Sequence, residues 1–202
     1  MKKLLAAMFV ALLMVVCVES STPNVPTVPP NSDLDQLLAR IAIDLDNKET
    51  LEKIIAQARD GKNLQKRGEK ELWYFPDEQT PYTGWVKDMH KNGRIEGLVQ
   101  VKAGKMSGLI NVWYENGQKK AEGTFKDGKM DGLLKGWYEN GQKKTEGNWK
   151  DGKFMSAEAW KPNGENCPVT NLKDGNGVAV MYEDDGTEGG RTTYKDGKVV
   201  FD

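Results

Sequence analysis

His90 is the only histidine of the chain and the first residue to consider for acid–base or metal chemistry. Such chemistry normally needs partners at set spacings, such as a second histidine or a cysteine pair. Cys167 has no cysteine near it, and Cys17 lies in the apolar N-terminal run. His90 precedes Tyr114 by 24 residues and Tyr138 by 48, which places it in a recurring aromatic position. We therefore expect its ring to pack within a strand, and we predict no catalytic residue and no metal ligand.

Other catalytic signatures are missing from the sequence. No serine lies in a Gly-x-Ser-x-Gly turn, and no Gly-x-x-x-x-Gly-Lys-Ser/Thr loop is present to hold a phosphate group. Carboxylates are abundant, but Glu115 and Glu139 occupy the same position in successive repeats, whereas a catalytic pair is usually unique. The formal net charge is -1, so no general basic field attracts nucleic acid. We expect that the protein is not an enzyme, and that it has neither a cofactor nor a nucleic-acid partner.

Aromatic side chains form the main candidate binding surface. They recur beside glycines such as Gly123 and Gly147, so a ring would lie across glycine backbone in the next strand and bury area in a thin sheet. The alternative is that the rings are exposed on one face, where they would contact a partner protein, or an envelope polymer or carbohydrate. The residues of this candidate face are Trp113, Tyr114, Trp137, Tyr138, Trp149 and Trp160.

Lysines also recur at fixed positions of the repeats. Lys119 and Lys120 return as Lys143 and Lys144, with glutamates close to them in the sequence. Opposite charges in this pattern indicate cross-strand pairing on the solvated side of a sheet. A column of lysines that binds an anionic polymer or lipid headgroups is the alternative.

The elements that carry these residues are predicted to be short strands joined by two sets of turns. The first set reads Lys-x-Gly, and its leading apolar residue recurs at intervals of 24, 24, 23 and 22 residues, at Val101, Phe125, Trp149, Leu172 and Tyr194. The second set alternates with it, at Asn92-Gly93, Asn116-Gly117, Asn140-Gly141, Asn163-Gly164 and Asp185-Gly186. Asn-Gly and Asp-Gly pairs favour type I′ hairpin turns, in which both central residues have positive φ. The regular spacing predicts an open single-layer antiparallel array of β-hairpin repeats.

The N-terminus has the pattern of an export signal. Two lysines precede an apolar run that is too short to span a membrane, which predicts a signal peptide over residues 1–20. Cleavage before Ser21 would release the protein to the periplasm or the outside. Lipidation of Cys17 would instead anchor it to a membrane, although Val16 is bulky for a lipoprotein signal. Proline-rich residues 21–32 predict an extended linker.

A helical segment is predicted over residues 33–68, before the repeat domain at 69–202. Apolar residues from Leu34 to Ala58 recur at a period near 3.6, which indicates two helices or one kinked helix. Asp46 followed by Glu49 indicates an N-cap, and Asp60-Gly61 indicates the C-terminal end. The apolar stripe would pack on the β region, or it would mediate dimerisation or partner binding.

The repeats carry a family resemblance over residues 72–202. The string from Glu122 to Gly132, Glu-Gly-Thr-Phe-Lys-Asp-Gly-Lys-Met-Asp-Gly, is similar to the MORN repeat, and Glu146 to Lys153 matches it again. The Tyr-x-Asn-Gly-Gln-Lys-Lys strings resemble proteins grouped as YwqK-type antitoxins. The chain departs from the MORN pattern at Asp131-Gly132, where His-Gly is usual, and the register drifts after Trp160. The resemblance implies a scaffold or interaction surface, or the neutralisation of a partner toxin.

These observations predict an exported, non-catalytic MORN-repeat scaffold or protein-interaction module. Binding of an envelope polymer or carbohydrate through exposed aromatic rings is one alternative, and a toxin-neutralising antitoxin is another. The signal peptide argues against the antitoxin, which would act in the cytoplasm. The sequence leaves open the identity of the partner, the oligomeric state, and the fate of Cys17.

Overall fold

The computed structural model describes residues 43–201 of the chain. The predicted signal peptide, the linker, Cys17 and the first part of the predicted helical segment lie outside the described residues. The described elements are α3 (Lys48–Gln57), β1 (Arg59–Asp60), the 3₁₀ turn η1 (Gly61–Asn63), β2 (Gln65–Arg67), β3 (Leu72–Tyr74), β4 (Gly84–Met89), β5 (Ile95–Lys102), β6 (Lys105–Trp113), β7 (Lys119–Lys126), β8 (Lys129–Met130), β9 (Gly132–Trp137), β10 (Lys143–Lys150), β11 (Lys153–Ala159), β12 (Gly177–Tyr182), β13 (Glu188–Lys195) and β14 (Lys198–Val199).

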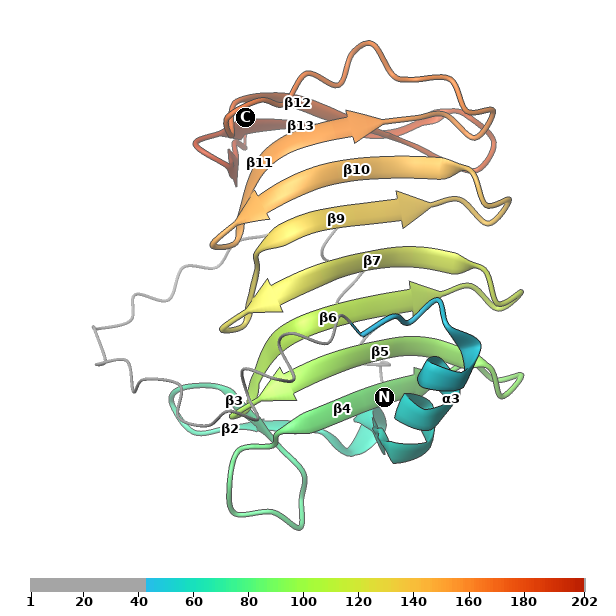
Figure 1. Ribbon diagram of the computed structural model, residues 1–202. Helices are drawn as coiled ribbons and strands as arrows, with labels where there is room; N and C mark the ends of the chain where they lie inside the picture. Colours follow the sequence, from blue (N-terminus) through green and yellow to red (C-terminus); the bar gives the residue numbers. More distant parts are fainter. Residues whose placement is uncertain (1–42, 202) are drawn as a thin grey trace.

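The strands form one large open sheet and two small ones. The order in the large sheet is β1-β4-β5-β6-β7-β9-β10-β11, and β8 pairs with β7. From β4 onward the neighbours are antiparallel, whereas β1 runs parallel to β4. The small sheets are β2-β3 and β12-β13-β14, which lie at opposite ends of the large sheet (Figure 1). The prediction of a mainly β, open architecture with a short helix is confirmed.

The Lys-x-Gly turns adopt the predicted type I′ geometry. Both central residues have positive φ, for example 50° at Asp127 and 86° at Gly128. Each turn is also hydrogen-bonded to the preceding hairpin. The Gly128 N–H donates to the Met106 carbonyl oxygen over 2.8 Å, and the Gly152 N–H donates to that of Met130 over 2.8 Å. The turns are therefore linked to one another along one edge of the sheet.

The Asn-Gly turns at the other edge differ from the prediction. Gly117 is left-handed with φ of 91°, but Asn116 is not among the described residues with positive φ. Its Oδ1 accepts the Gln118 N–H at 2.8 Å, and its Nδ2 donates to the Glu139 carbonyl oxygen of the next turn at 3.2 Å. Asparagine is suited to this turn by two side-chain hydrogen bonds and not by a positive φ. The prediction of type I′ geometry is wrong at this edge.

The main core lies on one side of the large sheet. Neighbouring residues of a strand point to opposite sides, and one of these two sets is buried along the whole array. It includes Val86, Val99, Ile110, Phe125, Leu134, Trp149 and Phe154. Trp73 and Phe75 join the core at its N-terminal end, and Leu172 and Tyr194 join it at its C-terminal end.

Within this core, the Phe154 ring lies across the backbone of Gly147, as the sequence predicted for rings beside glycines. An added Cβ on Gly147 would lie 2.5 Å from the Phe154 ring and 2.5 Å from the Ser156 carbonyl oxygen. The Phe154 ring also stacks on that of Trp149, with centroids 4.6 Å apart. The close approach of ring to glycine backbone is therefore part of how this thin sheet buries apolar area.

The opposite side of the large sheet, called the outer face below, is covered over its first strands. Leu98 and Trp113 of this face are buried with Leu45 and Ala58, and side chains of α3 pack against this cluster. Figure 1 shows α3 in front of β4 and β5. Full burial of a leucine such as Leu98 contributes about 1.5 to 3 kcal/mol of transfer free energy. The predicted apolar stripe thus packs on the β region in the part that the structure describes.

The helix is shorter than the sequence predicted. Its N-cap is Asn47, whose side chain accepts the Thr50 N–H, and not Asp46. It ends at Gln57, and Ala58 is already extended. Residues 59–67 hold β1, η1 and β2 instead of helix, because β1 pairs with β4. Among residues 43–201 no helix is long and apolar enough to cross a membrane.

Candidate binding face

His90 lies where the 24-residue spacing placed it. Its Nε2 is 2.9 Å from the Trp113 carbonyl oxygen. Tyr114 donates its hydroxyl to the Trp137 carbonyl oxygen at 2.8 Å, and Tyr138 makes the same bond to Trp160 at 2.7 Å. The three side chains form one column, in which each ring is bonded to the next hairpin. His90 therefore belongs to the aromatic column, as predicted, but it lies in the turn directly after β4 and not within a strand.

The six candidate aromatic residues do not share one exposed face. Trp149 belongs to the main core, and Trp113 is buried below α3, each with 6% of its surface exposed. Tyr138 is buried and Tyr114 is half-buried in the column of hydroxyl bonds. Trp137 and Trp160 remain half-buried on the outer face. The alternative of one exposed aromatic face therefore loses its basis, and most of these rings are packed within the fold, as the first interpretation expected.

Lysines cover the two half-buried tryptophans. The Lys119 Nζ lies 5.8 Å from the Trp137 ring centroid, and the Lys143 Nζ lies 4.7 Å from that of Trp160. Both distances are within the range of a cation–π contact. The lysine column predicted from the sequence is thus bound to rings and carboxylates of its own sheet.

The first of these lysines holds a segment from outside the sheet. The Lys119 Nζ is 2.5 Å from Asp46 Oδ1 and 2.8 Å from Glu122 Oε2, and 19% of its side chain is exposed. Burial alone would lower the pKa of Lys119, but the hydrogen bonds to Asp46 and Glu122 outweigh it and raise the pKa above its ordinary value. The Lys135 ammonium adds an ion pair to Glu122 at 3.3 Å.

The second lysine repeats this arrangement without the added segment. The Lys143 Nζ is 2.8 Å from Glu146 Oε2, and 43% of its side chain is exposed. Leu133, on the same face, is 40% exposed. No described helix or strand lies in front of β9, β10 and β11 in Figure 1. The outer face is therefore covered over β4 to β6 and open over β9 to β11, within residues 43–201.

A groove of about 330 Å³ crosses the open part of this face. Glu146 and Asn148 of β10, Ser156 and Glu158 of β11, and the loop 171–173 line it. Glu146 and Glu158 are directly opposite each other in the antiparallel pair. The Asn148 Nδ2 donates to Ser156 Oγ at 3.1 Å beside them. The groove is polar and shallow, which suits a side chain or backbone of a peptide more than a small apolar ligand.

Other reactive groups of the described chain are used in packing. Cys167 is 2% exposed, and its Sγ lies 3.1 Å from the Tyr182 hydroxyl oxygen. In the acidic stretch near the C-terminus, Glu188 pairs with both ends of the Arg191 guanidinium at 3.0 Å, and Asp185 accepts the Thr187 N–H. No three acidic, histidine or cysteine side chains converge on one point in residues 43–201.

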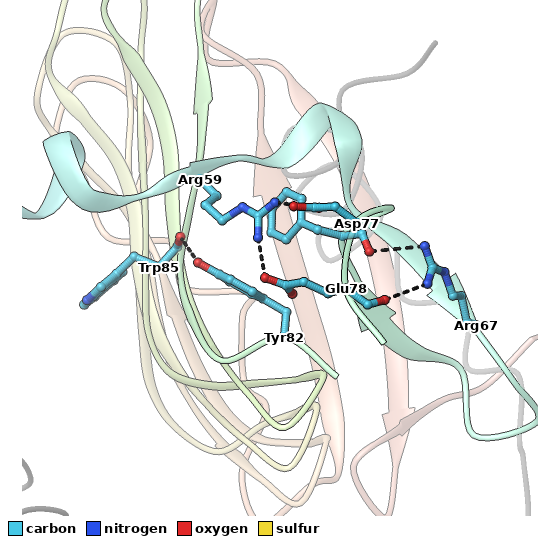
Figure 2. A network of polar contacts seen from close by, with 7 residues as sticks. Arg59, Arg67, Asp77, Glu78, Tyr82 and Trp85 are labelled. Atoms are coloured by element: carbon cyan, nitrogen blue, oxygen red, sulfur yellow. Dashed lines mark hydrogen bonds and ion pairs between the residues drawn. The ribbon is translucent and has the colours of Figure 1, made fainter. Parts of the chain in front are cut away.

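A polar network at the N-terminal end was not foreseen from the sequence (Figure 2). The Arg59 guanidinium lies over the Phe75 ring, 3.5 Å from its centroid, and donates to Asp77 at 3.0 Å and to Glu78. The hydrogen bond from Arg59 to Asp77 holds the pKa of Asp77 below its usual value. Arg67 donates to the carbonyl oxygens of Phe75 and Glu78 at 3.1 and 3.0 Å. The network fixes the loop after β3 to β1, so its role is structural.

Comparisons with known proteins identify no family. No protein-family model matches the chain, and no curated protein matches it. One solved structure, described as the crystal structure of TarM, is similar over 76% of this chain and 25% of that chain, with 13% sequence identity and a TM-score of 0.29. This chain thus spans a quarter of the TarM chain. At that TM-score the likeness carries no argument about fold or function.

Proposed function

We propose that this chain is an exported, non-catalytic interaction module built from MORN-like repeats. Its partner is a protein that binds the open part of the outer face, over β9 to β11. The observation that carries the proposal is the contrast along one face. The first strands are covered by α3 and residues 43–46, and this cover reaches Trp137 through Asp46 and Lys119. Leu133 of β9 stays 40% exposed next to the cover, and Trp160 after β11 has no described segment on it. Aromatic side chains are enriched at protein contact surfaces, and Trp137 and Trp160 are half-buried on this face.

The polymer-binding alternative has lost its main support. It required several exposed tryptophans on one face, but Trp113 and Trp149 are buried, and Trp137 and Trp160 already carry lysine ammonium groups. A protein partner fits a surface of mixed apolar and charged side chains better.

The proposal is tested by photocrosslinking in the native host. A photoreactive phenylalanine analogue replaces Leu133 on the open face, and a matched control replaces Lys102, which is exposed at a Lys-x-Gly turn. We expect position 133, and not position 102, to crosslink to one discrete protein. The purified partner should then bind the chain, and Leu133→Glu should weaken the Kd at least tenfold. Equal labelling at the two positions would refute the proposed face.

Export is tested separately, by the intact mass of the protein from its native envelope fraction. A chain that begins at Ser21 would be a freely released module, and one that begins at acylated Cys17 would be anchored to a membrane. Retention of Met1 to Ser20 in a soluble fraction would contradict export and would favour the cytoplasmic antitoxin.

A further inference from the structure

The covered part of the outer face shows how this sheet holds a peptide segment. Residues 43–46, Ile-Asp-Leu-Asp, lie against β6 and β7. Leu45 is 6% exposed in the cluster with Trp113, and Asp46 binds Lys119 over the Trp137 ring. The segment therefore places an apolar side chain in a hollow and the charge that follows it on a lysine.

The next repeat presents the same framework with no described segment on it. Lys143 takes the place of Lys119, Glu146 that of Glu122, and Trp160 that of Trp137. The exposed fraction of the lysine side chain rises from 19% to 43% between the two sites. The groove of about 330 Å³ begins beside this second site.

The charges opposite the glutamate differ between the two sites. Asn111 and Lys135 are opposite Glu122, whereas Lys135 and Glu158 are opposite Glu146. Lys135 is directly opposite both Glu122 and Glu146 in the sheet, so each glutamate has a cation on that side. On the other side of Glu146 the opposing residue is Glu158, which is exposed and has no ion pair within the described chain. Like charges directly opposite each other in a sheet are destabilising, and an added cation relieves the repulsion. The first site accepts a carboxylate, whereas the charges of the second site favour a cation.

We propose that the groove over β10 and β11 binds a segment of the partner protein that carries one lysine or arginine next to an apolar residue. The cation lies between Glu146 and Glu158, and the apolar residue packs toward Trp160. Lys143 is paired with Glu146 and Lys173 lines the groove, so these two cations disfavour a partner segment with a run of positive charges. This inference rests on the proposed function, because it specifies the partner of the same face.

The test is a titration of the full chain with short probe peptides. Binding is monitored through the NMR signals of the Trp160 indole N–H and the Glu158 amide. The probes are acetyl-Ile-Arg-Leu-amide, acetyl-Ile-Gln-Leu-amide and acetyl-Ile-Asp-Leu-amide. We expect the arginine peptide to bind at least tenfold more tightly than the other two at low salt. The preference should shrink as added salt screens the charges. Equal affinity of the three peptides would overturn the inference.

Charge-reversed variants separate this site from a general surface effect. Glu158→Lys removes the unpaired carboxylate and places a cation opposite Glu146, as Lys135 is opposite Glu122 at the first site. This variant should therefore reverse the order and favour the aspartate peptide. The control Glu139→Lys changes the net charge equally at an exposed turn residue and should leave the order unchanged. A well-dispersed spectrum confirms that each variant is folded. An unchanged preference in Glu158→Lys would overturn the inference.

Three further results are decisive. Arg40 is the basic residue closest in the sequence before residue 43, so it is the competing ligand within the chain. Binding of the arginine peptide only in an Arg40→Gln variant would identify Arg40 as the ligand, and would overturn the assignment to a partner. If the peptides show no preference while position 133 still crosslinks to a protein, the basic segment is refuted and the proposed function stands. If neither the peptide preference nor the crosslink at position 133 is found, both the basic segment and the proposed function are refuted.

Discussion

At the scale of single residues, the aromatic column of His90, Tyr114 and Tyr138 links successive hairpins through hydrogen bonds. Tyr138 is 1% exposed and donates to the Trp160 carbonyl oxygen at 2.7 Å. Tyr138→Phe would leave that carbonyl without this donor, so we expect the free energy of unfolding to fall by about 1 to 2 kcal/mol. Urea unfolding followed by circular dichroism measures the change. Tyr74→Phe is the control, because its hydroxyl has no hydrogen bond within the described chain; equal losses in both variants would contradict the role of the column.

Tyr114 makes the stability of the sheet sensitive to alkali. Burial, together with the charges of Asp184 and Glu139, raises its pKa from the ordinary 10.0 to about 12. Between these two values the unfolded chain has lost the phenolic proton while the folded chain keeps it. The stability is therefore complete below pH 10 and declines as the pH rises toward 12.

A comparison of chemical unfolding at pH 9 and pH 11 measures this effect. The decline should be smaller in Tyr114→Phe, which has no proton to lose. An equal decline in the wild type and the variant would show that other groups determine the alkaline sensitivity.

The residue scale also shows what a sequence can reveal about a candidate site. The position of His90 followed from its spacing to Tyr114 and Tyr138, because a repeat places equivalent residues in equivalent environments. The exposure of the tryptophans did not follow, because it depends on which side of the sheet each ring takes and on what covers that side. Trp113 and Trp137 are equivalent in the repeat, yet α3 covers only the first of them.

At the scale of elements, close packing of rings on glycine limits what the strands tolerate. A Cβ on Gly147 would lie 2.5 Å from the Ser156 carbonyl oxygen, so the backbone of β11 would have to move. We expect Gly147→Ala to lower the free energy of unfolding by about 1 to 3 kcal/mol, as overpacking does elsewhere.

Gly190 provides a matched control in β13. An added Cβ there meets no atom within 4 Å, so Gly190→Ala should be close to neutral. Thermal unfolding of the two variants compares them directly. Similar losses of stability in the two variants would mean that strand propensity, and not the contact with Phe154, explains the effect of replacing Gly147.

The turns show where local sequence rules succeed and where they fail. The Lys-x-Gly turns join their strands by two residues and have the type I′ geometry predicted for Asp-Gly, as at Asp127. The Asn-Gly turns contain the same type of signal, but a register shift precedes them, for example between Val112 and Trp113. The extra residue changes the turn, so only Gly117 takes the left-handed conformation. The presence of these hairpins was predictable, whereas the turn type depended on the bulge.

At the scale of the whole molecule, the ends of the array were the least predictable part. Arg59–Asp60 is a two-residue parallel strand with no local signal, and it exists because β4 offers an unpaired edge there. The Arg59 network joins residues separated by 18 and 19 positions, a contact that no periodicity indicates. The strands between these ends could be predicted because consecutive hairpins pair with their neighbours in one antiparallel sheet.

Contacts between neighbouring strands dominate the large sheet, and they determine how the molecule responds to damage. In a repeat array the stability is approximately a sum over units and their interfaces, so a local defect should remain local. Leu98→Ala removes a buried side chain below α3, which typically costs about 2 to 5 kcal/mol. We expect faster amide hydrogen exchange in β4 to β6 for this variant, and in β9 to β11 for Gly147→Ala. Exchange measured by mass spectrometry on peptides from each hairpin distinguishes the two patterns. Uniform acceleration across all strands in both variants would instead show that the shared main core, which runs from Trp73 to Tyr194, makes the sheet unfold as one cooperative unit.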